Sequence, residues 1–312
     1  MSRERLSLRL HSKVAGLLAL AAVACYAGGG AANATAQPAA VSVDDLGQAL
    51  AQPTAPARVI SLLPSLTETV CALGACERLV GVDRYSDWPA KPVALLPKVG
   101  GGLDPNIEAI VALRPDVVLL SADRRTVQRL HRLGVRTVAL EPRNLADVQR
   151  TLYSVAQVLQ LPSATAMRTW QQLHSGIQEA AASVPKAARG ARVYFEVNSG
   201  PFAAAPDSFI GELLAQLQVD NVVPSGRGPF PRLSPEFVVR AQPDVIVMGR
   251  YSQQSGGGYP GWETLRAVQQ QRVCQLSAAQ SSLVVRPGPR MDEAAHIMAT
   301  CLREKAPPHA SE

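Results

Sequence analysis

The chain has 312 residues, of which 47% are hydrophobic and 18% are charged, as is typical of a globular protein long enough for two domains. The formal net charge is +6, but the first 36 residues hold 4 basic and 1 acidic residue, so the other 27 basic and 24 acidic residues leave +3. Only 4% of residues are aromatic, and no basic run is interleaved with them. Nucleic acid is therefore excluded as the expected partner.

The N-terminus has the pattern of an export signal. Basic residues up to Lys13 precede the apolar run Val14–Ala24, which is too short to cross a bilayer comfortably. Small residues favour cleavage after Ala36, which predicts a soluble periplasmic protein with a signal peptide at 1–36. Attachment of a lipid at Cys25 is the alternative. Residues 37–57 are rich in Ala, Pro and Gln and are predicted to form a flexible linker.

From Arg58 onward, short β-branched runs alternate with amphipathic runs. Such alternation predicts an α/β lobe built on a parallel sheet, over residues 58–162. We expect strands at 58–63, 78–83, 117–121 and 136–140, with helices that start near Ser65, Asn106 and Arg124 and a further helix at 145–159.

A long helical stretch follows Pro162 and is interrupted only by Gly176, so residues 163–186 are predicted to connect two lobes. The second α/β lobe is expected at 187–304, before a tail at 305–312. The fold class is thus α/β, with two parallel-sheet lobes joined by one long helix. The expected elements of the second lobe are strands at 192–197, 244–249 and 272–276 and helices at 208–217, 235–241 and 291–302.

One passage occurs twice, 128 residues apart, at 108–120 and 236–248. Each copy has a short amphipathic run, a Pro-Asp pair that ends it, and a β-branched run suited to a buried strand. Asn106 and Ser234 stand two residues before the copies as candidate N-caps. The repeat predicts two lobes of one plan with a cleft between them.

Removal of the first 36 residues leaves four cysteines, an even number in an exported protein. Cys71 and Cys76 flank the end of a predicted helix, while Cys274 lies in a predicted strand and Cys301 in the last helix. The proximity of these elements predicts two disulfides, Cys71–Cys76 and Cys274–Cys301, with four buried free thiols as the alternative.

Five segments follow one another between residues 58 and 302. They are Arg58-Val-Ile-Ser-Leu-Leu-Pro-Ser-Leu-Thr-Glu68, Leu79-Val-Gly-Val-Asp-Arg-Tyr-Ser-Asp-Trp-Pro89, Val99-Gly with Asn106-Ile-Glu108, Leu113-Arg-Pro-Asp116 and Arg286-Pro-Gly-Pro-Arg290. In this order the chain resembles the periplasmic solute-binding proteins with a single linking helix, which supply cobalamin, ferric siderophores and haem to importers. The second segment is most similar to the cobalamin-binding branch.

The resemblance implies a monomeric receptor without catalytic activity or a cofactor of its own. It implies capture of cobalamin or a related corrinoid and delivery to the permease of an ABC importer with its ATPase. Tyr85 follows a strand and is expected at the carboxyl end of a parallel sheet, where open α/β sheets bind ligands. By resemblance it packs on the corrin ring, with loop packing as the alternative, and Phe230 forms an opposing wall. Phe202, which follows the strand at 192–197, is a weaker contact candidate by the same geometry.

The chain departs from these relatives in three places. Gly102 stands where the family has a tryptophan, and residues 281–286 lack another. Gly101 lies near the position of the tyrosine ligand of haem-binding relatives, which argues against haem. Arg286 is expected to meet an anionic ligand, either a siderophore carboxylate or a phosphate or amide edge of a corrinoid. The missing tryptophans and Arg286 make a ferric siderophore the alternative ligand.

The glutamates at the head of each repeat match a pair that, in the cobalamin and siderophore proteins, projects from the two lobes toward arginines of the permease. Glu108 and Glu236 are therefore expected to dock the importer. The alternative is that each merely favours the N-terminus of its own helix.

Metal sites and catalysis have weaker support. Outside the two termini, His131, His174 and His296 are the histidines, and each lies in a predicted helix rather than in a cluster, so no metal site is expected. An exported hydrolase that uses Ser61 or Ser65 is a distant alternative, because the chain lacks a G-x-S-x-G elbow.

Overall fold

The computed structural model describes residues 42–51, 53–249 and 259–308. Residues 41–312 belong to one structural unit, which includes both lobes. The predicted export signal, with Cys25, lies outside the described residues. Among the helices that are described, none is long and apolar enough to cross a membrane.

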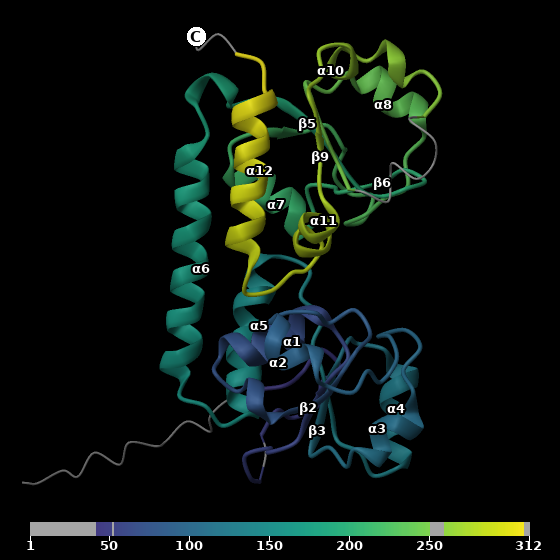
Figure 1. The fold of residues 1–312 in the computed structure, drawn as a ribbon, viewed down its shortest axis with the longest axis vertical. Coiled ribbons are helices and arrows are strands. Elements are labelled where there is room, and N and C mark those ends of the chain that lie inside the picture. Colours follow the sequence, from purple (N-terminus) through teal and green to yellow (C-terminus); the bar gives the residue numbers. More distant parts are fainter. Residues whose placement is uncertain (1–41, 52, 250–258, 309–312) are drawn as a thin grey trace, which may run out of the picture. The chain divides into compact units, whose positions relative to one another are not determined.

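The first lobe contains a four-stranded parallel sheet with the order β2-β1-β3-β4 (Figure 1). The strands are buried on both faces, as expected for β-branched runs in a parallel sheet. All four predicted strands are confirmed, each slightly shorter than expected, as β1 (Val59–Ser61), β2 (Leu79–Val82), β3 (Val117–Leu120) and β4 (Thr137–Ala139).

Helices cover both faces of this sheet. Alternate strand residues, such as Val117 and Val118, belong to different core clusters. The cluster of Val117 includes side chains of α1 (Pro64–Ala72) and α5 (Leu145–Val158). The cluster of Val118 includes side chains of α3 (Ile107–Ala112) and α4 (Arg124–Arg132). The sequence analysis did not predict the short α2 (Ala90–Ala94) or the 3-10 helix η1 (Cys76–Arg78).

The second lobe has a five-stranded sheet with the order β6-β5-β8-β9, in which β7 also pairs with β5. Only β6 is antiparallel. The three predicted strands are confirmed as β5 (Arg192–Asn198), β8 (Val245–Met248) and β9 (Val273–Gln275). The two-residue strands β6 (Phe202–Ala203) and β7 (Asp220–Asn221) were not predicted, because runs so short carry no alternation.

The predicted helices of the second lobe are confirmed as α7 (Phe209–Gln216), α8 (Pro235–Ala241) and α12 (Met291–Lys305). Ser208 and Ser234 cap the first two through their side chains. The elements that were not predicted are α10 (Arg266–Gln269), α11 (Ala278–Val284) and the 3-10 helices η2 (Lys186–Ala188) and η3 (Trp262–Thr264).

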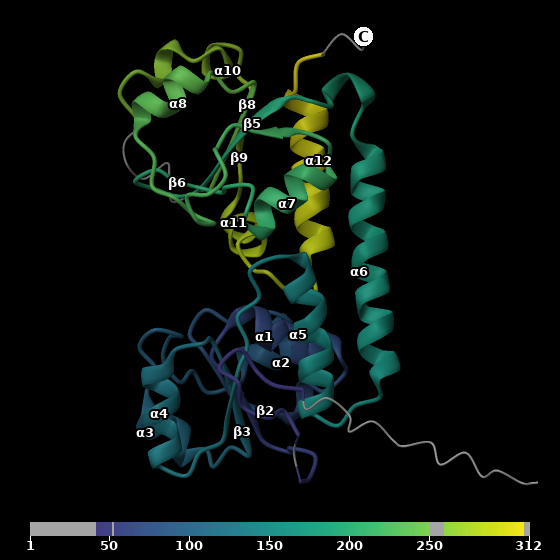
Figure 2. The same cartoon turned by 180° about the vertical axis from the view of Figure 1, so that it is seen from behind.

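The connecting helix α6 (Ser163–Ser183) packs into the cores of both lobes. Ala166 belongs to the core of the first lobe, whereas Leu173 and Ile177 belong to that of the second. Trp170 packs against both. Figures 1 and 2 show α12 alongside the upper part of α6. The helix is therefore part of each lobe rather than a free tether.

The sequence repeat is a structural repeat. In each copy the helix ends at a left-handed residue, Arg114 with φ 47° and Gln242 with φ 43°. An aspartate then accepts a hydrogen bond from the start of the neighbouring strand, Asp116 from the Arg58 amide at 2.8 Å and Asp244 from the Arg192 amide at 2.9 Å. The two lobes thus use one device to join helix, turn and strand.

Both predicted disulfides are present, Cys71–Cys76 and Cys274–Cys301. The second joins β9 to α12 and closes a loop of sequence separation 27, against 5 for the first. In the chain-entropy account, the longer loop gives the larger stabilisation.

The flexible linker predicted at 37–57 is wrong for residues 42–51. Leu50 is fully buried in the core of the first lobe, and the carboxylate of the buried Asp44 accepts a hydrogen bond from the Ala139 amide at 2.9 Å. Asp45 pairs with Arg150 at 2.6 Å. The sequence suggested a linker because the segment has no hydrophobic periodicity. Asp44, Asp45 and Leu50 nevertheless hold it against the lobe.

Gly176 permits the close approach of α6 and α12, because a Cβ at this position would lie 2.7 Å from Cβ of Asp292. We expect Gly176→Ala to destabilise the protein by about 1–3 kcal/mol, despite the better helix propensity of alanine, because the two helices must move apart. Urea unfolding checks this. The control Ser175→Ala, an exposed position on α6, should change stability by less than about 0.5 kcal/mol. Equal effects of the two changes would contradict the close-approach argument.

Candidate ligand-binding and docking site

The loop after β2 carries Tyr85, and a buried carboxylate holds its backbone. Asp83 is fully buried at the end of the strand and accepts hydrogen bonds from the Tyr85 amide at 2.8 Å and from the Ser86 hydroxyl. Burial raises the pKa of Asp83, while these two hydrogen bonds oppose the rise. The loop is therefore held by Asp83 rather than by the tyrosine ring.

The Tyr85 side chain is exposed, and a second loop lies beside it. The ring is 62% exposed, which fits a contact face better than loop packing. Arg84 holds the second loop in place. Its amide donates to the Gly100 carbonyl at 2.7 Å, and its guanidinium pairs with Asp104 at 2.5 Å. That loop contains Gly102 and the 94% exposed Leu103. Sequence reasoning missed Leu103, because a single leucine in a glycine-rich loop forms no pattern.

In the second lobe, a two-stranded ribbon presents Phe202 and Phe230. The Ala203 amide donates to the Pro231 carbonyl and the Ala205 amide to the Pro229 carbonyl, both at 3.0 Å. In this register Phe202 lies opposite Arg232 and Phe230 lies opposite Ala204, so both rings are on one face of the ribbon. Each is 38% exposed.

The Phe230 ring also packs edge-on against Phe209, with centroids 5.7 Å apart. Phe209 begins α7, and its amide donates to the carbonyl of Arg143 in the first lobe at 3.1 Å. The ribbon therefore adjoins a contact between the lobes. The ring contacts among the described residues include none between Tyr85 and either phenylalanine.

Arg286 joins the lobes, contrary to its expected role as a ligand contact. Its guanidinium pairs with Glu68 at 2.8 Å and Asp87 at 2.6 Å, and donates to the Tyr85 carbonyl at 3.0 Å. The Arg286 side chain is only 9% exposed and that of Glu68 only 3%. The interlobe carboxylates, rather than a ligand, satisfy this guanidinium.

The loop that carries Arg286 approaches the first lobe closely at Gly288, where a Cβ would lie 3.3 Å from Cβ of Ser65. Ser65 is buried beneath this loop, and the buried Ser61 donates its hydroxyl hydrogen to the Leu63 carbonyl at 3.0 Å. Ser61 and Ser65, the nucleophiles of the hydrolase alternative, are therefore both buried in the structure.

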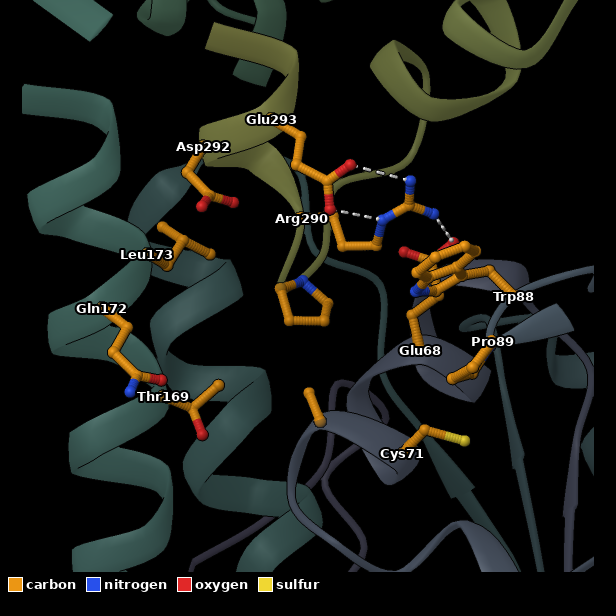
Figure 3. Close-up of a pocket in the computed structure, with 12 residues that line it drawn as sticks. Glu68, Cys71, Trp88, Pro89, Thr169, Gln172, Leu173, Arg290, Asp292 and Glu293 are labelled. Carbon is orange, nitrogen blue, oxygen red and sulfur yellow. Dashed lines mark hydrogen bonds and ion pairs between the residues drawn. The ribbon is translucent and has the colours of Figure 1, made fainter. Parts of the chain in front are cut away.

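Arg290 forms a second contact between the lobes (Figure 3). Its guanidinium lies 4.2 Å above the ring of Trp88, pairs with Glu293 at 2.9 Å, and reaches Glu68 at 3.5 Å. These residues border a pocket of about 360 Å³ between α1, α6 and α12. Asp292 also lines this pocket, and burial raises its pKa. Trp88 is thus an interlobe contact.

The repeated glutamates occupy equivalent positions in the two lobes. Asn106 caps α3 and Ser234 caps α8, each by accepting a hydrogen bond from a backbone amide, as predicted. Glu108 and Glu236 lie exposed in the first turns of these helices. Backbone and Ser234 hydrogen bonds lower the pKa of Glu236.

The histidines lie in helices, as predicted: His131 in α4, His174 in α6 and His296 in α12. Within the described part of the chain, no group of three or more His, Cys, Asp or Glu could hold a metal ion.

Comparison with protein families gives a match to the periplasmic binding protein model over residues 59–279. The chain belongs to this family. A periplasmic binding protein is exported, which agrees with the predicted export of this chain and with its two disulfides.

Relatives of this periplasmic binding protein include a vitamin B12-binding protein of Pectobacterium atrosepticum. It is 28% identical over 256 residues, which cover 80% of this chain and 89% of the relative. An uncharacterized ABC transporter substrate-binding lipoprotein of Bacillus subtilis, YvrC, is 26% identical, covering 78% of this chain and 79% of the relative. The names of these relatives denote binding and transport rather than catalysis.

Solved structures share the two-lobe α/β fold. The periplasmic haem-binding protein BhuT, in complex with two haems, has a TM-score of 0.70 at 26% identity, covering 81% of this chain and 99% of that one. The vitamin B12-binding protein BtuF of Vibrio cholerae has a TM-score of 0.66 at 24% identity, covering 81% and 99%. The predicted fold class is confirmed.

The interlobe ion pair yields a stability prediction. Arg286→Met leaves the Glu68 carboxylate buried without its main partner, so we expect a loss of about 3–5 kcal/mol in the free energy of unfolding. The double variant Glu68→Gln/Arg286→Met should recover much of this loss. Urea unfolding of the parent, both single variants (Arg286→Met and Glu68→Gln) and the double variant checks both expectations, and Arg240→Met, on the exposed side of α8, is the control.

The same variant has a predicted pH dependence. Burial raises the pKa of Glu68, and Arg286 opposes the rise, so loss of Arg286 raises it further. A carboxyl whose pKa is raised in the folded state makes its full contribution to stability below its ordinary pKa of 4.5. That contribution is lost as the pH rises through the raised pKa. The deficit of Arg286→Met should therefore shrink below pH 4.5. A deficit that stays constant with pH would contradict this account.

Proposed function

We propose that this chain is the substrate-binding component of an ABC importer that captures cobalamin or a related corrinoid and delivers it to the membrane permease. The observation that carries the proposal is the exposed aromatic faces of both lobes, Tyr85 in the first and Phe202 with Phe230 in the second. Flat apolar rings gain burial and dispersion from a large planar ligand at little cost in side-chain entropy. Relatives named for vitamin B12 binding support the same ligand class.

The alternative ligand, a ferric siderophore, loses one argument. Arg286 was expected to meet an anionic ligand, either a siderophore carboxylate or a phosphate or amide edge of a corrinoid, but its guanidinium is engaged by Glu68 and Asp87. At Gly102 a Cβ would lie 3.0 Å from the Leu62 carbonyl oxygen, and the exposed Leu103 supplies an apolar surface on the same loop instead of the tryptophan of the relatives. We therefore keep the corrinoid as the main proposal and the siderophore as the alternative.

Titration of the chain from residue 37 onward with cyanocobalamin, a ferric siderophore and hemin, followed by calorimetry and absorption spectra, tests the ligand class. We expect stoichiometric binding of cyanocobalamin without turnover. Tight binding of a ferric siderophore alone would select the alternative. Tight binding of hemin alone, with a ligand-field spectrum, would reject both.

Tyr85→Ala should weaken cyanocobalamin binding by about 1–3 kcal/mol, because the ring contributes contact area to the ligand. The midpoint of thermal unfolding of the ligand-free protein should hardly change, because Asp83 holds the loop. Tyr85→Phe keeps the aromatic face and should bind nearly as well. Tyr153→Ala, which removes an exposed tyrosine of α5, is the matched control. Unchanged affinity in Tyr85→Ala would remove this residue from the site.

Docking by Glu108 and Glu236 is tested separately. Charge reversal of both to lysine should leave ligand affinity intact but slow uptake in reconstituted vesicles and weaken permease binding, with part of the defect masked at high salt. Glu179→Lys, at an exposed position on α6, is the control for net charge. Uptake at the normal rate by the double variant would leave the glutamates with only a helix-terminal role.

A further inference from the structure

The outer side of α4 is unusually basic for a helix of nine residues. Its inner side packs into the core of the first lobe through Val127 and Leu130. No ion pair found among the described residues includes an arginine of this helix. Four arginines are exposed, and together with the following exposed leucine they are called the α4 face: Arg124, Arg125, Arg129, Arg132 and Leu133.

Stability of the helix explains only part of this arrangement. Arg125, Arg129 and Arg132 are spaced by four and three residues, so like charges are neighbours along one stripe. The helix dipole favours Arg129 and Arg132 in the last turn, but it disfavours Arg124 and Arg125 in the first turn, which holds no acidic residue. The carboxylate of the N-cap Asp123 accepts hydrogen bonds from the Thr126 hydroxyl and from backbone amides of the first turn. Arg124 and Arg125 are therefore not explained by the helix dipole.

The position of α4 relates the α4 face to the docking glutamates. Helices α3 and α4 share one core cluster and lie side by side in both views of the fold (Figures 1 and 2). Helix α3 leads into the parallel strand β3 and α4 follows it, so the first turns of both helices are at the carboxyl edge of the sheet. Glu108 lies in the first turn of α3, and Arg124 and Arg125 lie in that of α4. If Glu108 docks the permease, as proposed above, the α4 face is held close to the membrane.

The surroundings of α4 favour lipid over an acidic protein surface. A groove of about 290 Å³ lies between α4 and the segment 42–51. Its lining combines the apolar Leu46 and Val127 with the polar or charged Gln48, Arg124, Gln128 and His131. Leu133, which follows the last arginine, is 55% exposed. Guanidinium groups next to exposed apolar surface suit the interface of a bilayer, where phosphates lie above hydrocarbon.

We propose that the α4 face binds the phosphate groups of anionic phospholipids at the membrane surface beside the importer. The planar guanidinium forms paired hydrogen bonds with phosphate oxygens, and several basic side chains near an anionic surface add their attraction. This binding concentrates the receptor at the membrane and restricts its search for the permease to two dimensions. That the α4 face is turned toward the membrane rests on the proposed function, but its binding to anionic lipid does not.

Co-sedimentation of the chain from residue 37 onward with vesicles of phosphatidylglycerol and phosphatidylethanolamine tests this proposal. We expect binding at low salt that is at least about tenfold weaker in Arg125→Gln/Arg129→Gln/Arg132→Gln and is absent from phosphatidylcholine vesicles. The control Arg168→Gln/Lys186→Gln/Arg303→Gln removes the same charge from exposed positions elsewhere and should bind as the parent does. Both triple variants should keep the parent affinity for cyanocobalamin.

Three outcomes overturn the proposal. The first is that the parent chain does not sediment with anionic vesicles. The second is that both triple variants lose vesicle binding equally. The third is that the Arg125→Gln/Arg129→Gln/Arg132→Gln variant binds anionic vesicles normally but loses binding to the permease held in neutral lipid. The last result would assign the face to an acidic protein surface. The double variant Glu108→Lys/Glu236→Lys should still bind anionic vesicles, so failure of the docking glutamates and failure of lipid binding are distinguishable.

Discussion

The buried ion pair between Arg286 and Glu68 is the interaction on which the relation of the two lobes depends. Two side chains from distant parts of the sequence meet where water is largely excluded, so each needs the other to offset the loss of hydration. The guanidinium also binds the Tyr85 carbonyl, which ties the interlobe contact to the loop that carries the main candidate ligand residue. The contact between the lobes and the position of the Tyr85 loop are therefore linked through one arginine.

A second physical theme is duplication. Each lobe joins a capped helix, a left-handed turn residue and a buried strand in the same way, and an aspartate in each copy anchors the neighbouring strand. Because the helices are rigid and equivalent, Glu108 and Glu236 occupy matched places without any direct interaction. A pair of exposed carboxylates on two matched lobes gives orientation to an encounter more than it gives affinity.

The sequence predicted the role of a single residue correctly where the role depends on nearby residues. It did not do so where the role depends on a partner far away in the sequence. Asn106 and Ser234 cap their helices because the capping side chain bonds to an amide three residues on. Arg286 was expected to meet a ligand, since the sequence does not reveal that Glu68 and Asp87, about 200 positions away, surround it. For the same reason, residues 42–51 read as a linker although Asp44 bonds to Ala139 across 95 positions.

The sequence by itself determined the α/β class, the two lobes, the connecting helix and the disulfide pairs, because periodicity, caps and breakers act over a few residues. It also identified the repeat that places Glu108 and Glu236. Only the tertiary structure decided that Arg286 and Arg290 belong to the contact between lobes, that Leu103 is exposed on a loop bonded to Arg84, and that α3 and α4 are neighbours. These facts depend on which side chains meet after the chain folds back on itself, and no local pattern encodes such meetings.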